Sequence, residues 1–319
     1  MAWDGIPWFV ENTAASEETL RLIVEAAAGG GEGIVAPADL RVTALDLPAA
    51  AVQIGTGAMI ARRRAAGGSQ SYAARMATTE LVNVEPTGAD GPRSDLIVAR
   101  VEDPYGGESW PEPTDPLIGP YVFTRVIPDV LPGTTSIQDV DPDSTAITLA
   151  RIDLPASTAS ITAARIVDLR QMARPRSETR RVYLYAAWTT ADELGPVTDW
   201  EEFPLGARWT NTVPEWATHC GVHTQITGVR HPDAVLAKGE LRTYLGDEKG
   251  PGMQYLAETA ARMTLQAGHT FLIPPEDRGT VVPLGVEGKG AVGATGLLQA
   301  DLGTVLAVDI VFSQAPVAA

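Results

Sequence analysis

The 319-residue sequence has almost no cysteine, since Cys220 is the only one, and no disulfide can therefore form within the chain. It also lacks any run of about 18 apolar residues, so the sequence predicts no membrane-spanning helix. The N-terminus has neither the basic segment nor the apolar core of a signal peptide. We therefore expect a protein made in the cytoplasm and stabilised by burial and oligomerisation.

Positive charge is scarce as well. The chain has 40 acidic and 24 basic residues, only three of them lysines, and a formal net charge of −16. The acidic residues are spread over both halves and do not form a tail. Because such a surface repels nucleic-acid phosphates and anionic lipids, we expect no nucleic-acid partner and no membrane insertion.

Glycine and proline are frequent, with 31 and 24 residues, whereas aromatic residues make up only 6% of the chain. Chain-breaking residues spread along the whole sequence favour many short strands over long helices. The length corresponds to two or three domains. These features predict a mainly β protein.

One clear helix is predicted near the N-terminus, with Ser16 as its cap and the glycines 29–31 at its end. Its apolar face consists of Leu20, Ile23, Val24 and Ala27. A second short helix is predicted over residues 162–172, with Thr162 as its cap. Strands are expected at 39–45, 51–55, 58–61, 71–75, 96–101, 121–127 and 146–154.

The strand at 96–101 is apolar at nearly every position, which is typical of a strand covered on both faces. Such a strand is hard to cover within one small domain. We therefore infer that neighbouring protomers share its burial.

The segment 173–177, Ala-Arg-Pro-Arg-Ser, is the main predicted linker, because it is polar, contains proline and borders a change of pattern. It divides the chain into an N-terminal β-rich attachment and oligomerisation region, 1–175, and a C-terminal domain, 176–319. Short strands beyond the linker, broken by Gly and Pro turns, predict a jelly-roll-like β-sandwich. In the strand at 305–312, four alternate residues should face its core: Leu306, Val308, Ile310 and Phe312.

Several segments of the first domain resemble the minor tail proteins of tailed phages that infect Actinobacteria. The baseplate upper proteins of other long-tailed phages are more distantly similar. The segments are WFVEN (8–12), GIVAPADL (33–40), VQIGTGA (52–58), PRSDLIVARV (92–101), LARIDLPAST (149–158) and SITAARIVDLR (160–170). Residues 180–319 resemble the second domain of those minor tail proteins, with less distinctive motifs.

The resemblance implies a non-enzymatic structural protein of the virion tail tip, synthesised in the host cytoplasm and usually a homotrimer. Its N-terminal part would contact other tail-tip or baseplate proteins, and its C-terminal β domain would face outward. Two alternatives remain. One is a module that recognises a host cell-envelope glycan, and the other, less favoured, is a cell-wall or capsule hydrolase.

The histidines and the cysteine offer a weak case for a metal site. His219 and His223 would share one face of a strand and Cys220 the other, so a site would need His231 or Asp233 as a further ligand. Ordinary surface or strand histidines are the favoured interpretation, also for His269. In a trimer, symmetry-related histidines could meet on the axis.

Three tryptophans lie close together in sequence: Trp200, Trp209 and Trp216. Tryptophans flanked by carboxylates, here Asp199, Glu201 and Glu202, can stack on sugars, but we expect these rings to anchor the core and interfaces of the β domain. No carboxylate pair is singled out for glycoside hydrolysis.

Two further motifs receive simple interpretations. The glycine-rich segment 285–293 lacks the spacing of a phosphate-binding loop. The arginines 62–64 are expected at a solvated strand end, or else against the acidic surface of a neighbour. The sequence thus assigns no catalytic, cofactor-binding or metal-binding residues and no cofactor.

Overall fold

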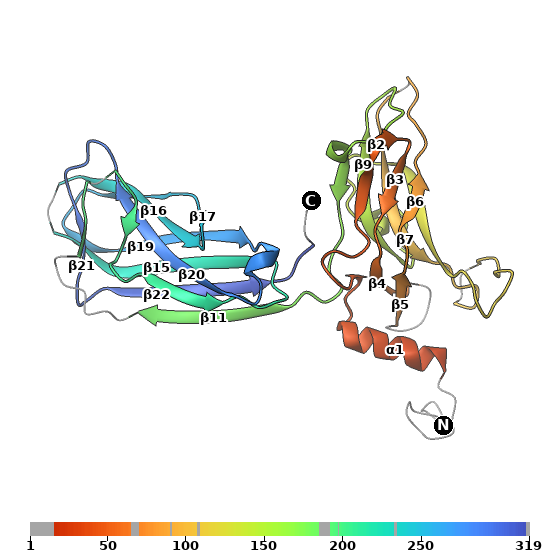
Figure 1. Ribbon diagram of the computed structural model, residues 1–319, viewed down its shortest axis with the longest axis horizontal. Helices are drawn as coiled ribbons and strands as arrows, with labels where there is room; N and C mark the ends of the chain where they lie inside the picture. Colours follow the sequence, from red (N-terminus) through yellow and green to blue (C-terminus); the bar gives the residue numbers. More distant parts are fainter. Residues whose placement is uncertain are drawn as a thin grey trace. The chain divides into compact units, whose positions relative to one another are not determined.

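The computed structural model describes residues 16–64, 70–89, 91–106, 109–184, 192–196, 198–232 and 235–316. The protein is mainly β, as expected, with one α-helix. The chain forms two compact units (Figure 1). The second unit is Arg176–Gln314, and the first comprises the residues up to Pro175 together with those from Ala315 on, so the boundary at 175/176 falls within the predicted linker. Each is described by itself below, as the N-terminal unit and the C-terminal unit.

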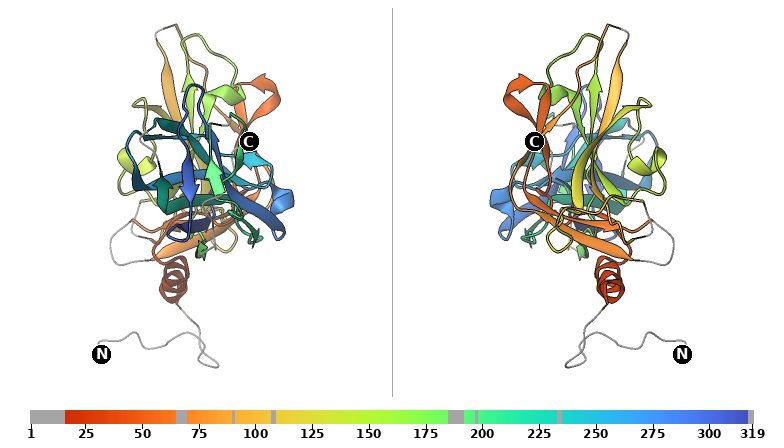
Figure 2. Two further views of the ribbon diagram at one scale, coloured as in Figure 1. Left: turned by 90° about the vertical axis from the view of Figure 1, so that its left-hand side faces the viewer. Right: turned by 90° about the vertical axis from the view of Figure 1, so that its right-hand side faces the viewer.

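The N-terminal unit starts with α1 (Glu17–Ala28). Ser16 caps the helix by accepting a hydrogen bond from the backbone N–H of Thr19, and Gly29 ends it in a left-handed conformation, φ 63°, as the sequence predicts. The helix packs along β4 and β5 (Figures 1 and 2). Of its predicted apolar face, however, Ile23 and Val24 are only half-buried and Leu20 is exposed.

The N-terminal unit contains ten strands in three antiparallel sheets. The sheet β10-β9-β7-β8, here called the central sheet, packs on two small sheets, β1-β4-β5 and β2-β3-β6. The strands are β1 (Gly33–Ile34), β2 (Val42–Ala49), β3 (Ala51–Ile54), β4 (Gly57–Arg62), β5 (Ser71–Met76), β6 (Glu80–Asn83), β7 (Arg93–Val101), β8 (Val122–Val130), β9 (Ala146–Leu154) and β10 (Ile166–Asp168).

Both faces of the central sheet are covered within the chain, which corrects one inference from the sequence. Residues 94–99 of β7 are all buried. Ile97 faces the small sheets, while Leu96 and Val98 pack on the other face against Ile137, which lies in a 3₁₀ turn (η1, Ile137–Asp139) after β8. The connector after β8 thus covers the strand, so its burial needs no neighbouring protomer.

The second predicted helix, 162–172, is wrong. Residues 163–165 form only a 3₁₀ turn (η2, Ala163–Arg165), and the chain then continues as β10 on the edge of the central sheet. The N–H of Leu169 donates to Leu149 O at 3.1 Å, so pairing with β9 has replaced helical hydrogen bonds. The predicted linker also starts one residue too early, since Ala173 is buried and its N–H donates to Ile34 O.

The C-terminal unit is a sandwich of two antiparallel sheets. The first has the order β11-β22-β15-β21-β12, with β19 also on β15, and the second β13-β20-β16-β17, with β14 on β20 and β18 on β16. Strands are β11 (Ser177–Leu184), β12 (Asp192–Leu194), β13 (Glu201–Glu202), β14 (Arg208–Thr212), β15 (His219–His231), β16 (Ala237–Leu245), β17 (Glu248–Lys249), β18 (Met253–Ala257), β19 (Ala261–Leu272), β20 (Val281–Gly290), β21 (Leu298–Ala300) and β22 (Val305–Ser313), with a 3₁₀ turn, η3 (Pro275–Asp277), between β19 and β20.

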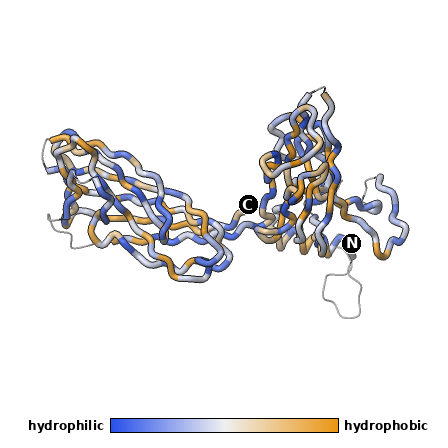
Figure 3. Tube along the Cα trace, turned by 45° about the horizontal axis from the view of Figure 1, so that its top comes forward, coloured by the Kyte–Doolittle hydropathy of each residue, from blue (hydrophilic) through white to orange (hydrophobic). Residues whose placement is uncertain are grey.

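The chain crosses repeatedly between the two sheets of this unit. It passes from β11 to β14, back to β15, across to β16 and β18, back to β19, across to β20 and back to β22. This is the connectivity of a jelly roll. Hydrophobic and hydrophilic residues alternate along many of the strands (Figure 3). The four predicted core residues of β22 are fully buried: Leu306, Val308, Ile310 and Phe312. Asp309, between two of them, faces outward.

No helix in the described ranges is both long and apolar enough to cross a bilayer.

Candidate functional site

The outer face of the second sheet of the C-terminal unit carries a continuous set of polar side chains. In β16, Ala237 and Leu241 belong to the core, so alternation turns Lys238 and Glu240 outward. Glu240 lies opposite both Gln254 of β18 and Lys289 of β20, and Lys238 lies opposite Leu256. Three neighbouring strands therefore present Lys238, Glu240, Gln254, Leu256 and Lys289 on one face.

Trp200 lies against this face and is held there by cations. The guanidinium carbon of Arg242 is 4.0 Å from its ring centroid, and the ammonium of Lys289 is 4.6 Å away. Arg242 also pairs with Glu287 at 2.8 Å, and Lys249 pairs with the same carboxylate at 3.1 Å. Burial acts to raise the pKa of Glu287, but the hydrogen bonds from Arg242 and Lys249 outweigh it and hold that pKa below its usual value.

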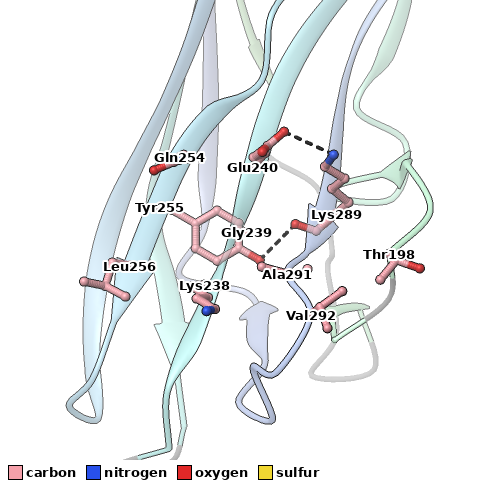
Figure 4. Close-up of a pocket in the computed structure, with 11 residues that line it drawn as sticks. Thr198, Lys238, Gly239, Glu240, Gln254, Tyr255, Leu256, Lys289, Ala291 and Val292 are labelled. Atoms are coloured by element: carbon pink, nitrogen blue, oxygen red, sulfur yellow. Dashed lines mark hydrogen bonds and ion pairs between the residues drawn. The ribbon is translucent and has the colours of Figure 1, made fainter.

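A pocket of about 560 Å³ opens on this part of the sheet (Figure 4). The ring of Tyr255 lies over the backbone of Gly239, where a Cβ would come within 2.5 Å of the phenol oxygen, so only glycine leaves room for the ring. The hydroxyl donates to the carbonyl of Lys289 at 3.4 Å. Burial, with a contribution from Glu201, raises the pKa of Tyr255 to about 12, so the phenol remains a hydrogen-bond donor at neutral pH.

The charged side chains among the described lining residues of the pocket are two ammonium groups and one carboxylate. Glu240 and Lys289 form an ion pair of 3.2 Å, drawn as a dashed line in Figure 4. The ammonium of Lys238 has no ion-pair or hydrogen-bond partner within the part of the chain that the structure describes. The pocket therefore carries a local positive excess on a protein with a net charge of −16.

The prediction that the three tryptophans anchor the core holds for two of them. Trp209 and Trp216 pack against the core, as expected for anchors of a β domain. Trp200 lies instead beside the pocket, next to the exposed Asp199 and the half-buried Glu201 and Glu202. The sequence did not single out the pocket residues. All three lysines of the chain, Lys238, Lys249 and Lys289, lie on this one sheet face, and that clustering was the available signal.

Comparisons with known proteins give little guidance. No protein-family model matches the sequence, and no curated protein matches it significantly. Among solved structures, the T13 particle of infectious bursal disease virus is 12% identical over 95% of this chain and 80% of that chain, with a TM-score of 0.24. The VP2 subviral particle of the same virus is 12% identical over 92% and 81%, with a TM-score of 0.24. BuGH86 in complex with neoagarooctaose is 9% identical over 83% and 33%, with a TM-score of 0.21.

TM-scores this low carry no argument about fold or function.

The predicted histidine arrangement is partly correct. His219 and His223 lie on the outer face of β15, and Cys220 lies in the core, where burial raises the pKa of its thiol to about 12. After a bulge at Gly228, His231 turns inward, and its two ring nitrogens lie 2.9 and 2.8 Å from backbone carbonyls. His231 therefore cannot complete a site with the other two.

Asp233 lies outside the described residues. Among those that the structure describes, no group of three or more His, Cys, Asp or Glu side chains is arranged to hold a metal ion.

The glycine-rich segment and the arginine run both have structural roles. Residues 281–290 form strand β20, in which a Cβ at Gly285 would come within 2.4 Å of the Tyr244 hydroxyl, so glycine admits that ring. The arginines 62–64 are not a solvated strand end, because all three are half-buried. Arg64 pairs with Glu32, and Arg63 donates to Gly106 O at 2.5 Å.

The pocket does not provide the carboxylate pair that glycoside hydrolysis requires. Glu240 is the one carboxylate among its described lining residues, and it is already paired with Lys289. A glycosidase places two carboxyl groups about 5–10 Å apart, on opposite sides of the scissile bond. The pocket can bind polar groups, and its described lining lacks the second carboxylate that glycoside hydrolysis requires.

Proposed function

We propose that the chain is a non-enzymatic structural component of a phage virion, a minor tail protein of the tail tip that works as a homotrimer. The N-terminal unit attaches to other tail-tip or baseplate proteins, and the C-terminal jelly roll faces outward. The resemblance in sequence supports this proposal. Its segments 52–58, 92–101 and 149–158 lie in β3, β4, β7 and β9, the framework of the N-terminal unit.

The single observation that carries the oligomer is an apolar loop tip between β7 and β8. Leu117 is 97% exposed and Ile118 81% exposed. The loop extends away from the sandwich of its own unit (yellow in Figure 1). Two adjacent large apolar side chains held in water are stabilised when a partner covers them.

The loop tip is held in a defined conformation. The N–H of Leu117 donates to the Asp115 carboxylate at 2.9 Å, and the Tyr121 hydroxyl donates to Pro116 O at 2.6 Å. At the base of the loop, the N–H of Glu102 donates to Tyr121 O at 2.8 Å. An ordered tip loses little conformational entropy when it binds, which favours a role in contact.

The same unit offers a receptor for this tip. A groove of about 440 Å³ lies beside the base of the loop, and its apolar lining includes Met59, Met76 and Phe123. Insertion of the tip of one copy into the groove of the next is a head-to-tail contact, and such contacts form a ring when the rotation between copies closes. In the proposed trimer, the occupant of the groove is the loop tip of a second copy of this chain.

Light scattering on the full chain tests the proposal. The wild type should have three times the chain mass of 33.7 kDa. The double variant Leu117→Glu/Ile118→Glu should be a monomer with an unchanged melting temperature. Leu302→Glu is the matched control, because Leu302 is 82% exposed on a turn of the other unit, and it should remain a trimer. A wild type that is monomeric both in solution and in the assembled tail would overturn the trimer.

A second candidate function is contact with a host cell-envelope glycan. The pocket beside Trp200 favours it, because this ring is the one of the three tryptophans that lies outside the core. Aromatic rings next to hydrogen-bonding side chains are a common means of binding sugars.

A further inference from the structure

We propose that the pocket on the second sheet binds a saccharide that bears a carboxylate, with the ammonium groups of Lys238 and Lys289 as its contacts. This rests on the glycan-binding candidate and is independent of tail attachment and of trimer formation. Residues of β16, β18 and β20 line the pocket, together with Thr198 and the residues that follow β20 (Figure 4).

The lining matches the mixed chemistry of a sugar. Leu256 and Val292 offer exposed apolar surface for the C–H face of a sugar ring. The amide of Gln254 can donate to hydroxyl groups and accept from them, and the carboxylate of Glu240 can accept from them. The volume of about 560 Å³ lies within the usual range for small-molecule sites.

The charges select an anionic sugar. Two ammonium groups against one carboxylate leave an excess of one positive charge, and Lys238 has no counter-ion among the described residues. A single carboxylate on the ligand would balance this excess. A dianionic phosphate would exceed it, and the lining contains none of the arginine forks that suit phosphate.

The use of lysine supports the same interpretation. The chain uses arginine for 21 of its 24 basic residues, yet both cations of the pocket are lysines. An ammonium on a flexible stem donates three hydrogen bonds in adjustable directions, whereas a guanidinium is a rigid planar fork. A carboxylate on a sugar ring, surrounded by hydroxyls, suits the adjustable donor.

Calorimetric titration of the full chain at low salt tests the proposal. The probes are three acidic oligosaccharides, trigalacturonic acid, a hyaluronan tetrasaccharide and 3′-sialyllactose, beside the neutral sugars maltotriose, chitotriose and lactose. We expect at least one acidic probe to bind about tenfold more tightly than its neutral counterpart, a difference of about 1.4 kcal/mol.

Three lysine variants locate the site. Lys238→Gln should weaken binding of that probe about tenfold, and the double variant Lys238→Gln/Lys289→Gln should weaken it further. Lys249→Gln is the matched control, because Lys249 lies on the same sheet face outside the pocket, and it should bind like the wild type. Thermal melts of all three variants show whether the unit is still folded.

Each remaining outcome overturns a defined part of the proposal. Equal binding of acidic and neutral sugars would overturn the claim that the ligand must carry a carboxylate, but it would still support glycan binding. Displacement of the acidic probe by inorganic phosphate at similar concentration would indicate a general anion site and overturn the saccharide. If none of the six sugars bound the folded protein at millimolar concentration, both the acidic-saccharide site and the glycan-binding candidate would be overturned. The proposed trimer would be unaffected, because light scattering tests it separately.

Discussion

The two units bury their strands in different ways. In the C-terminal unit, β22 alternates, with Ile310 in the core and Asp309 on the surface. In the N-terminal unit, neighbouring residues of β7 are both buried, with Leu96 on one face of the sheet and Ile97 on the other. A continuous apolar strand is therefore no evidence for a partner subunit, because a long connector of the same chain can fold back over it.

The units also differ in what they expose. The N-terminal unit holds Leu117 and Ile118 outward on an ordered loop, and such a surface favours association with protein. The C-terminal unit places Lys238 and Lys289 in the lining of a pocket and Trp200 beside it. This contrast supports the proposed division of roles between attachment and outward contact.

The largest expected effect breaks the alternation in β22. Ile310→Asp places an unpaired carboxylate in a fully buried position and should destabilise the C-terminal unit by about 4 kcal/mol or more. Asp309→Asn, the adjacent control, removes an ion pair with Arg181 at the surface and should cost less than about 1 kcal/mol. Urea unfolding of both variants measures the difference. If the Asp309 variant proved the less stable of the two, the register of β22 would be wrong by one residue.

The second prediction compares neighbouring residues in β7. Leu96→Ala and Ile97→Ala should each destabilise the N-terminal unit by about 2–5 kcal/mol, because each removes a fully buried side chain from a different face of the sheet. The unfolding transition of the N-terminal unit, measured by thermal unfolding of the full chain, gives this loss of stability. The same experiment on Asp309→Ala and Ile310→Ala should show a large loss for Ile310 alone. A small loss at Leu96 would show that the connector around Ile137 does not pack on the sheet in solution.

A third prediction uses a buried carboxylate of the N-terminal unit. Glu102 is paired with Arg125 and Arg100, both at 2.8 Å. Burial acts to raise its pKa, but hydrogen bonds from Arg125 and Arg100 hold that pKa below the ordinary 4.5. The contribution of ionised Glu102 to the free energy of unfolding is therefore fully present above pH 4.5. It is lost as the pH falls through the lower pKa of the folded state.

Glu102→Gln should thus cost about 1.5–3 kcal/mol at pH 7, the usual worth of hydrogen bonds to charged groups. The difference in stability from wild type should narrow as the pH falls below 4.5 and through the lower pKa of the folded state. Melting temperatures across this range measure it, with Glu85→Gln as the control at an exposed position. A gap that stays constant with pH would mean that the charge of Glu102 contributes nothing.

The smallest expected effect concerns the boundary between the units. Trypsin should cut after Arg176, which is exposed, whereas the bond after Arg174 is protected by Pro175. Because each unit has its own core, each fragment should melt within a few degrees of its temperature in the intact chain. Early cleavage within 205–316 would show that the second half is not one folded unit.

The sequence by itself determined the local elements. The cap at Ser16 and the glycine at position 29 fixed the ends of α1, and period-two patterns predicted most strands, including the inward residues of β22. These features depend on neighbours a few residues apart, which is why they are visible in one dimension. The pattern at 162–172 failed because an open edge of the central sheet competed for the same backbone groups.

Only the tertiary structure decided how faces were covered and which side chains met. Strand register and sheet packing between distant segments place Ile137 over Leu96 and bring Lys238 and Lys289 into one pocket. They also place Trp200 outside the core that contains Trp209. Local patterns leave that register open, because a strand can satisfy its hydrogen bonds against many partners. The pairing is chosen by the apolar area that the whole unit buries.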